Sequence, residues 1–261
     1  MTPILLLGAG RMGGALIAGW GRANAFAPAE LMIRDPKPGP AALASGANLH
    51  PTREQQMTAP TVVFAAKPQD MRKIAAEVAD DLAPDAVIVS VAAGVATTDI
   101  AKAFGGRRVA RVMPTTAAAI GQGTASVFSA DPEARSRAHA LLAPVGAVID
   151  LDDEDLMHAA TAVSGSAPAY LYAFVEALQA AGEALGLTAD AARQLARATT
   201  AGAAALMAES GEDAAELRRQ VTSPAGTTEA ALKVLLGEHG LGPLLEKAAA
   251  AAEKRSRELG R

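Results

Sequence analysis

The sequence predicts an α/β protein: a doubly wound domain over residues 1–152 followed by an all-helical domain over residues 153–261. Two observations support this fold class. Short apolar runs alternate with helix-compatible stretches in the first part of the chain, and no convincing strand follows residue 152. Because the runs are continuous rather than alternating, we expect a parallel sheet that is covered on both faces.

Each expected element follows from the same pattern. Strands are expected at Ile4–Leu7, Leu31–Ile33, Thr61–Ala65, Ala86–Val91, Val109–Met113, Ala125–Phe128 and Ala147–Ile149. Helices such as Met71–Asp81 and Pro132–Leu142 are expected between them. In the second domain the expected helices are Asp153–Ala162, Ala167–Leu185, Ala189–Glu209, Asp213–Val221, Thr228–Leu236 and Gly242–Leu259, with Thr188 as an N-cap.

The composition limits the classes of function. Half of the 261 residues are hydrophobic, and the net charge is -4 with both signs scattered along the chain. This distribution gives no electrostatic footprint for a nucleic-acid partner. The chain has no cysteine, which excludes disulfides, thiolate nucleophiles and cysteine-ligated metals. The four histidines show no metal-ligand spacing, so no metal site is expected.

The amino-terminal apolar run is too short to cross a bilayer, and it lacks the basic region and cleavage site of a signal peptide. We therefore expect a cytoplasmic protein without a membrane partner.

A glycine turn directly after the first apolar run is the most specific local signal. The sequence Gly8-Ala9-Gly10-Arg11-Met12-Gly13 links the run Ile4–Leu7 to a helix-compatible segment. In a dinucleotide-binding turn, Gly8 permits the tight bend, Gly10 lets the backbone approach a pyrophosphate, and Gly13 lets the helix pack on the strand. The expected cofactor-binding residues here are Gly8, Gly10, Arg11, Met12 and Gly13.

The end of the second expected strand leaves the identity of the cofactor open. Asp35 lies about twenty residues beyond the glycine turn, where an acidic residue would receive the ribose hydroxyls of NAD. Arg34 and Lys37 flank it and could instead accept a 2′-phosphate. A solvated loop without a cofactor role is the alternative for all three, so NADPH and NADH both remain candidates.

Two further strand ends are candidates to line the same site, because ligands of open parallel sheets bind beyond the carboxyl ends of the strands. Small residues there would let a cofactor lie against the backbone. The candidates are Ala65, Lys67, Pro68, Ala92 and Gly94. Lys67 has the alternative of an ordinary solvated lysine.

The most unusual segment of the helical half is Val221–Glu229, in which a Pro-Ala-Gly break leads straight into a helix. The first helical turn would present the N–H groups of Gly226, Thr227 and Thr228, and the hydroxyls of Ser223, Thr227 and Thr228 cluster beside it. Such a helix start suits a carboxylate. Simple helix capping by these hydroxyls is the alternative.

A strip of small residues, Ala198–Ala208, lies on one expected helix. A helix face made of small side chains lets another helix pack closely against it. The strip therefore indicates contact with further helices, including those of a second subunit.

Taken together, these motifs resemble pyrroline-5-carboxylate reductase, the last enzyme of proline synthesis. The matching pieces run in family order over nearly the whole chain: Gly8–Gly14, Ala65–Gln69, Ser90–Val95, Arg111–Pro114, Ser164–Tyr170 and Val221–Thr228. The most specific is the Ser-Pro-x-Gly-x-Thr element, present here as residues 223–228.

The resemblance implies that NADPH or NADH reduces the C=N bond of Δ1-pyrroline-5-carboxylate to give L-proline. It implies that Ser223, Gly226, Thr227 and Thr228 hold the substrate carboxylate, and that the Thr228 hydroxyl contacts the ring nitrogen. Ser223 and Thr228 are thus the expected catalytic residues. The resemblance also agrees with a homodimer, or a higher homo-oligomer, whose active sites form near the subunit interface.

The chain departs from the family pattern in three places, of which Ala66, where the family often has valine, is a minor one. The usual Met-Pro-Asn-Thr-Pro is Met113-Pro114-Thr115-Thr116-Ala117 here, and Ala225 replaces a usual glycine. The altered loop is the best support for one alternative, a non-enzymatic NAD(P)-binding sensor or degenerate paralogue. A second alternative is an oxidoreductase of the 3-hydroxy-acid dehydrogenase type. It requires a catalytic lysine on a long helix of the second domain, and Asp153–Glu209 contains none.

Overall fold

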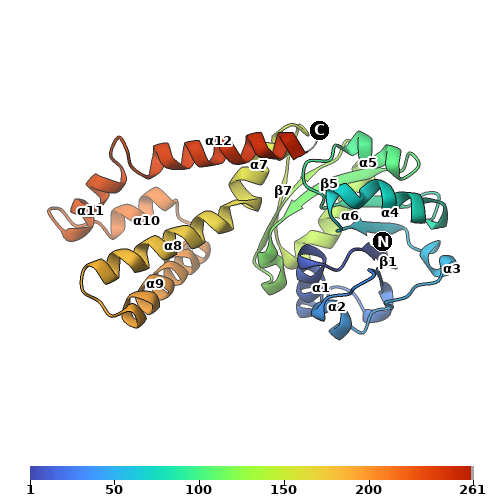
Figure 1. The fold of residues 1–261 in the computed structure, drawn as a ribbon, viewed down its shortest axis with the longest axis horizontal. Coiled ribbons are helices and arrows are strands. Elements are labelled where there is room, and N and C mark those ends of the chain that lie inside the picture. The colour runs from blue at the N-terminus through green and yellow to red at the C-terminus, as the bar shows by residue number, and fades with distance from the viewer. Residues whose placement is uncertain (260–261) are drawn as a thin grey trace. The chain divides into compact units, whose positions relative to one another are not determined.

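The computed structural model describes residues 1–259 (Figure 1). The chain forms two compact units. The first, the sheet unit, contains Met1–Gly165 and the residues from Ala252 onward, and the second, the helical unit, contains Ser166–Ala251. A boundary between functional domains after residue 152 remains a proposal.

All seven expected strands are present and form one sheet. They are β1 (Ile4–Leu7), β2 (Leu31–Arg34), β3 (Thr61–Phe64), β4 (Val87–Ser90), β5 (Val109–Pro114), β6 (Gly123–Phe128) and β7 (Gly146–Asp150). Their order is β2-β1-β3-β4-β5-β6-β7, and β1 to β5 are mutually parallel. The carboxyl ends of these five strands therefore share one edge of the sheet.

The expectation of a parallel sheet is wrong for the last two strands. β6 is antiparallel to β5, and β7 is parallel to β6. Only a short connection that contains the 3-10 segment η4 (Thr116–Ile120) joins β5 to β6. Because a parallel connection needs a crossover of a dozen or more residues, the chain turns back instead.

Two apolar clusters cover the two faces of the sheet. One includes buried residues of α1 (Arg11–Ala23), α2 (Pro40–Ala44) and α6 (Pro132–Leu142), and the other those of α4 (Met71–Val78) and α5 (Thr97–Ala103). The remaining short elements are η1 (Pro28–Glu30), α3 (Arg53–Gln56), η2 (Pro68–Asp70), η3 (Ala79–Asp81) and η5 (Ala143–Val145). The sheet is thus sandwiched between helices, as its continuous apolar strands require.

The sheet unit is completed by a late return of the chain. After β7, α7 (Leu156–Ala160) continues into a π-helical turn at Thr161–Gly165. The end of α12 (Leu241–Leu259) packs with it: Arg257 Nη2 lies 2.8 Å from Asp155 Oδ2, and His158 Nδ1 lies 2.9 Å from Ser256 Oγ.

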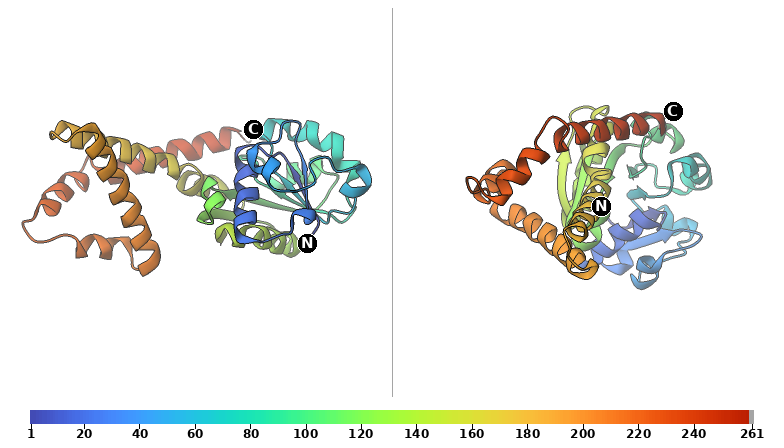
Figure 2. Two further views of the ribbon diagram at one scale, coloured as in Figure 1. Left: turned by 90° about the horizontal axis from the view of Figure 1, so that it is seen from below. Right: turned by 60° about the vertical axis from the view of Figure 1, so that its left-hand side comes forward.

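The helical unit contains α8 (Ala167–Ala184), α9 (Ala189–Ser210), α10 (Ala214–Gln220), α11 (Thr227–Leu235) and the first part of α12, seen from two further directions in Figure 2. As expected, Thr188 caps α9, with its Oγ1 accepting a hydrogen bond from Ala191 N at 3.3 Å. Within Ser166–Ala251, all of which the structure describes, only Ala192 and Ala196 are buried. None of the helices in residues 1–259 is long and apolar enough to cross a membrane.

Candidate active site

The glycine turn between β1 and α1 adopts the conformation that the sequence motif requires. Gly8 has φ +97°, and a Cβ there would lie 2.7 Å from the backbone nitrogen of Ala66, so both the bend and the neighbouring strand end demand glycine. A Cβ at Gly13 would collide with the carbonyl oxygen of Gly8. These two glycines are therefore fixed by packing within the chain.

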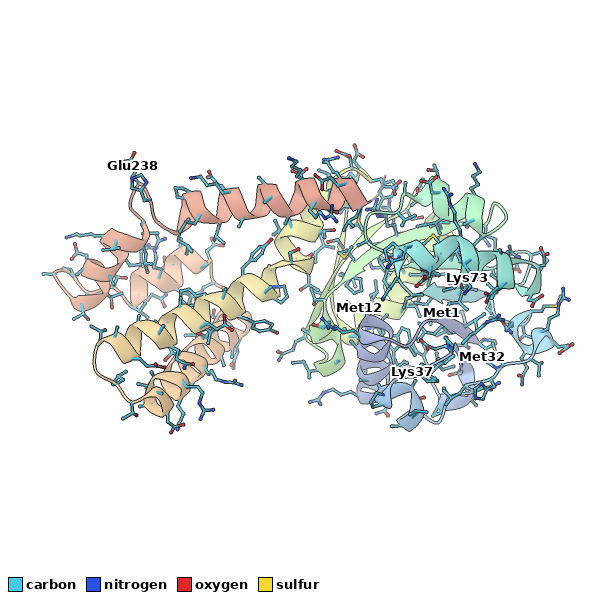
Figure 3. The ribbon with its side chains drawn as sticks, viewed as in Figure 1. Met1, Met12, Met32, Lys37, Lys73 and Glu238 are labelled. Atoms are coloured by element: carbon cyan, nitrogen blue, oxygen red, sulfur yellow. The ribbon has the colours of Figure 1, made fainter. Side chains whose placement is uncertain are left out.

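Gly10 differs from the other two glycines. It is the N-cap of α1 and is exposed, and a Cβ built on it would meet no described atom within 4 Å. The next residues, Arg11 and Met12, begin the helix. Arg11 is exposed, and Met12, which is labelled in Figure 3, is partly buried. The turn thus leaves free space beside the unpaired N–H groups of a helix start, which is the arrangement that a pyrophosphate fits.

Asp35 ties the end of β2 to the glycine turn. Its Oδ2 accepts a hydrogen bond from Ala9 N at 2.6 Å, and its Oδ1 accepts one from Lys37 N at 2.7 Å. Arg34 reaches toward Glu77 of α4, with 3.4 Å between Nη2 and Oε2, while Lys37 is exposed in the loop after β2 (Figure 3). The carboxylate therefore orients the turn itself, a role that spacing alone does not reveal.

The other expected cofactor residues follow β3 and β4 at the same edge. Ala65 N donates to Leu7 O at 2.8 Å, which places the end of β3 beside the start of the turn. Pro68 is partly buried and Lys67 is exposed, whereas Ala92 and Gly94 are buried after β4. The structure thus brings the carboxyl ends of β1, β2, β3 and β4 together at one edge of the sheet.

The segment before α11 forms a separate arrangement within the helical unit. The N-cap of α11 is Gly226, no side-chain cap hydrogen bond is formed there, and Thr227 and Thr228 are the first two helical residues. A Cβ at Gly226 would collide with Ser223 Oγ, so the serine hydroxyl lies directly against the helix start. The capping alternative for these hydroxyls therefore does not describe this helix start.

Glu229 contacts the loop before the helix and not the helix start itself. Its Oε2 accepts a hydrogen bond from Ala225 N, and its Oε1 lies 3.2 Å from Lys233 Nζ. Ala225 itself has φ +54°, a left-handed backbone conformation that residues other than glycine rarely adopt. The loop thus keeps the conformation of a glycine turn even with alanine at this position.

A partly buried charged cluster beside β4 and β5 was not predicted from the sequence. Arg111 of β5 is 2% exposed, and its Nη1 lies 3.1 Å from Glu154 Oε1. Both Glu154 oxygens also accept hydrogen bonds from Thr97, from its N and its Oγ1, at 2.7 Å each. The only available signal was an arginine inside an otherwise apolar strand.

The altered loop after β5 is held by its own threonine. Thr115 is 7% exposed, and its Oγ1 accepts a hydrogen bond from Thr124 N at 3.0 Å. Thr115 N in turn donates to Thr124 O at 2.9 Å. Thr115 therefore stabilises the turn into β6, although its hydroxyl cannot reproduce every hydrogen bond of an asparagine amide.

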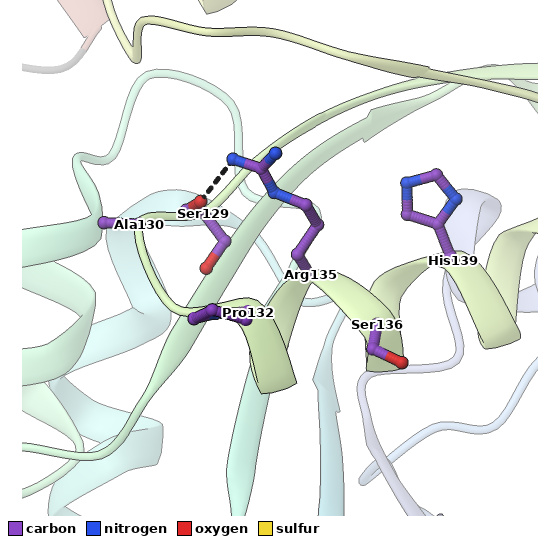
Figure 4. A pocket seen from close by; sticks show the side chains of 6 residues that line it. All are labelled: Ser129, Ala130, Pro132, Arg135, Ser136 and His139. Atoms are coloured by element: carbon purple, nitrogen blue, oxygen red, sulfur yellow. Dashed lines mark hydrogen bonds between the residues drawn. The ribbon is translucent and has the colours of Figure 1, made fainter.

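A further hollow lies along the start of α6, away from the strand ends described above, and is lined by Ser129, Ala130, Pro132, Arg135, Ser136 and His139 (Figure 4). Arg135 Nη2 donates to Ser129 O at 2.8 Å, and Ser129 Oγ donates to Val109 O at 2.7 Å. These polar groups are used within the fold, so the hollow is not a candidate active site.

Comparison with known proteins identifies the family. Pyrroline-5-carboxylate reductase of Pseudomonas aeruginosa is 39% identical over 267 residues, covering 99% of this chain and 97% of that protein. The enzyme of Corynebacterium melassecola is 36% identical and is covered in full. The chain belongs to the pyrroline-5-carboxylate reductase family. A family profile described as pyrroline-5-carboxylate reductase dimerisation matches residues 154–259, and one described as NADP oxidoreductase, coenzyme F420-dependent, matches residues 3–94.

Solved structures agree with this membership. The pyrroline-5-carboxylate reductase of Coxiella burnetii superimposes with a TM-score of 0.89 at 33% identity, covering 100% of this chain and 99% of that one. The Plasmodium falciparum enzyme with NADP bound gives a TM-score of 0.84 at 23% identity, which shows the shared fold. This family member thus has the fold of NAD(P)-dependent oxidoreductases and a homo-oligomerisation domain in its second half.

The competing dehydrogenase type shares the fold but little of the sequence. A 3-hydroxyisobutyrate dehydrogenase of Mycobacterium tuberculosis superimposes with a TM-score of 0.52 at 18% identity. At this identity the likeness shows the fold alone. Together with the absence of lysine from Asp153–Glu209, it leaves the reductase family as the assignment.

Proposed function

We propose that this chain reduces the C=N bond of Δ1-pyrroline-5-carboxylate with NADPH or NADH to give L-proline. The observation that carries the proposal is the near-full-length relationship to pyrroline-5-carboxylate reductases, 39% identical over 99% of the chain in the first case. The geometry of residues 223–228 gives the proposal its chemical content.

The substrate carboxylate would be held at the start of α11. Its partners would be the N–H groups of the first helical turn and the hydroxyls of Ser223 and Thr227. The helix dipole favours an anion there, and neither Gly226 nor any side chain caps the end. Glu229 already carries a lysine partner, Lys233, which reduces its repulsion of a second carboxylate.

Thr228 is the residue that we assign to the ring nitrogen. Reduction of an imine adds a hydride to carbon and requires a proton at nitrogen. The nicotinamide supplies the hydride when it is bound. The Thr228 hydroxyl would form a hydrogen bond with the nitrogen and thereby fix which carbon face is presented, while the carboxylate contacts fix the other end of the ring. No covalent intermediate is needed, in keeping with a chain that has no cysteine.

The sheet unit would hold the cofactor. The pyrophosphate would occupy the free space at Gly10, with Arg11 and Met12 beside it and Gly8 and Gly13 shaping the turn. The ribose end would contact the loop after β2, whose members are Arg34, Asp35 and Lys37. The nicotinamide end would lie along the residues that follow β3 and β4, namely Ala65, Lys67, Pro68, Ala92 and Gly94.

We further propose a homodimer as the minimal active form, with active sites near the subunit interface, and a cytoplasmic location. The small-residue strip Ala198–Ala208 supports the dimer, because all but Thr200 are exposed in the single chain.

A direct assay tests the function. Purified protein is incubated with Δ1-pyrroline-5-carboxylate and either NADPH or NADH, and both the loss of nicotinamide absorbance and the formation of proline are followed. We expect stoichiometric proline with at least one cofactor. Tight binding of NADPH or NADH without proline would refute the enzyme and favour the non-enzymatic sensor.

A further inference from the structure

The partly buried cluster of Thr97, Arg111 and Glu154 joins three distant segments of the sheet unit. Glu154 lies in the connection between β7 and α7, Arg111 in β5, and Thr97 at the first residue of α5. The Glu154 carboxylate accepts three hydrogen bonds from them: Oε1 accepts from Thr97 N and Arg111 Nη1, and Oε2 accepts from Thr97 Oγ1.

The cation of this cluster has few other partners. Arg111 is 2% exposed, and its Nε and Nη2 are buried without a hydrogen-bond partner among the described residues. A buried cation strongly favours a nearby carboxylate. Arg111 therefore fixes the position of Glu154, which in turn fixes Thr97.

Thr97 marks the far end of the loop that follows β4. At its near end the loop is held by hydrogen bonds from Val91 N to Phe64 O at 2.9 Å and from Ala92 N to Ser90 Oγ at 3.3 Å. At its far end the N-cap residue of α5, Ala96, provides no side-chain cap, and Glu154 takes that role from another segment. The stretch between the two anchors contains Gly94 with φ +80°.

We infer that Glu154 is a positioning residue for the cofactor: acting through Thr97, it holds the loop that carries Ala92 and Gly94 in the conformation that binds the nicotinamide end. The inference rests on the proposed function, because that function assigns Ala92 and Gly94 to the cofactor. In the sheet, Arg111 pairs in register with Ser90, the last residue of β4, so the cluster lies at the strand ends where the cofactor is expected.

The decisive variant is Thr97→Val, which keeps the shape and the backbone N–H of Thr97 but removes the hydroxyl bond to Glu154. We expect the dissociation constant for NADPH, or for NADH if that is the cofactor used, to rise about 3- to 10-fold, since a hydrogen bond to a charged group is lost. The Michaelis constant for pyrroline-5-carboxylate at saturating cofactor should stay within twofold. Thr97→Ser, which retains the hydroxyl, should restore the wild-type dissociation constant.

Hydrogen exchange gives a second readout that needs neither cofactor nor turnover. In the free Thr97→Val protein, amides of residues 93–97 should exchange faster than in the wild type. Thr188→Val is the control, because it also removes a threonine hydroxyl contact at a helix start, there with Ala191 N of α9. It should leave cofactor affinity and the exchange of residues 93–97 unchanged.

Glu154→Gln extends the series by weakening the contacts to both Thr97 and Arg111, and it should weaken cofactor binding more than Thr97→Val does. An unchanged dissociation constant in folded Thr97→Val protein, judged by circular dichroism and melting temperature, would overturn the inference even if Glu154→Gln fails to fold. Cofactor titration requires no catalysis, so the result is distinct from a failure of the reductase assay with wild-type protein.

Discussion

The sheet unit and the helical unit bury their apolar side chains to very different extents. The sheet unit has two extensive apolar clusters, one on each face, with Ile4, Leu6 and Phe64 among its fully buried residues. In the helical unit the large side chains remain exposed, among them Leu171, Tyr172, Phe174, Leu178, Leu195, Leu206, Met207, Val234 and Leu244. The difference shows that one unit completes its core within a single chain and the other does not.

An apolar surface of this extent is rare on a monomer and marks an interaction site. The helical unit coincides with most of the segment matched by the dimerisation profile. In the homodimer proposed above, its exposed side chains would be the part of the core that a second copy of the chain completes.

The strongest test introduces bulk on the exposed face of α9. Ala204→Trp should weaken association by about 30-fold or more, because overpacking costs about 1–3 kcal/mol for each of the two copies. Multi-angle light scattering across a dilution series measures the effect. Ala130→Trp, at an exposed position of the sheet unit, serves as the control and should remain associated. A fully dimeric Ala204→Trp protein would move the interface elsewhere.

The glycine turn provides a pair of opposite substitutions in the self-contained unit. Gly13→Ala should cost about 1–3 kcal/mol of folding free energy, because its Cβ meets the Gly8 carbonyl oxygen. Gly10→Val should leave the melting temperature nearly unchanged but abolish NADPH and NADH binding, because its side chain fills the space assigned to the pyrophosphate. Fluorescence titration and thermal melts separate the two. Wild-type affinity in Gly10→Val would remove the turn from the site.

In the helical unit, the expected effect falls on rate rather than stability. Thr228→Val should lower kcat/KM by about 10- to 150-fold, the equivalent of a lost hydrogen bond of roughly 1.5–3 kcal/mol to a group that develops charge. Ser223→Ala should mainly raise KM, because a carboxylate contact is present in both ground and transition states. Steady-state kinetics with melting curves as controls distinguish the roles. Normal kinetics in Thr228→Val would contradict our assignment.

The junction where α12 returns to the sheet unit should respond to pH. Burial, followed by the charges of Arg111 and Arg257, holds the pKa of His158 below its ordinary value of 6.5, against the weaker pull of Asp155 and Glu253. As the pH falls, the unfolded chain therefore binds a proton at His158 before the folded chain does. The contribution of His158 to the free energy of unfolding is complete above pH 6.5 and is lost as the pH falls below it. The loss is at most about 1.4 kcal/mol per pH unit. His158→Gln should flatten this part of the profile in urea unfolding between pH 7.5 and 5.5.

The smallest expected effect is at Ala225. Its left-handed backbone disfavours any side chain, so Ala225→Gly should change folding stability by less than about 1 kcal/mol, in the stabilising direction. Differential scanning calorimetry of the homo-oligomer at fixed concentration measures it. A clear loss of stability would show that the Cβ of Ala225 makes a contact worth more than the strain.

Much of the fold was predictable because its signals are local. Continuous apolar runs bounded by turn residues identified all seven strands, and glycine and proline breaks identified the helices of the second half. The direction of β6 was not predictable from its own residues. It depends on the short connection after β5. The general alternation of strands and helices predicted a parallel strand there, although that connection has no room for a crossover helix.

The candidate site likewise has parts that the sequence could indicate and parts that it could not. The glycine turn and residues 223–228 are contiguous motifs, so the sequence could indicate them. The contacts of Asp35 with Ala9 and of Arg111 with Glu154 join residues that are far apart in the chain, and only the folded structure brings them together. The left-handed conformation of Ala225 was likewise hidden, because alanine gives no sign of it.

The return of α12 makes the helical unit an insertion within the sheet unit rather than an appendage to it. During synthesis, Asp155 and His158 leave the ribosome long before Arg257 and Ser256, their partners in the finished unit. The sheet unit therefore cannot be completed until nearly the whole chain has been made. A fragment that stops at Gly165 would lack this closing contact, whereas a deletion that joins residue 165 to residue 252 through a linker could retain it.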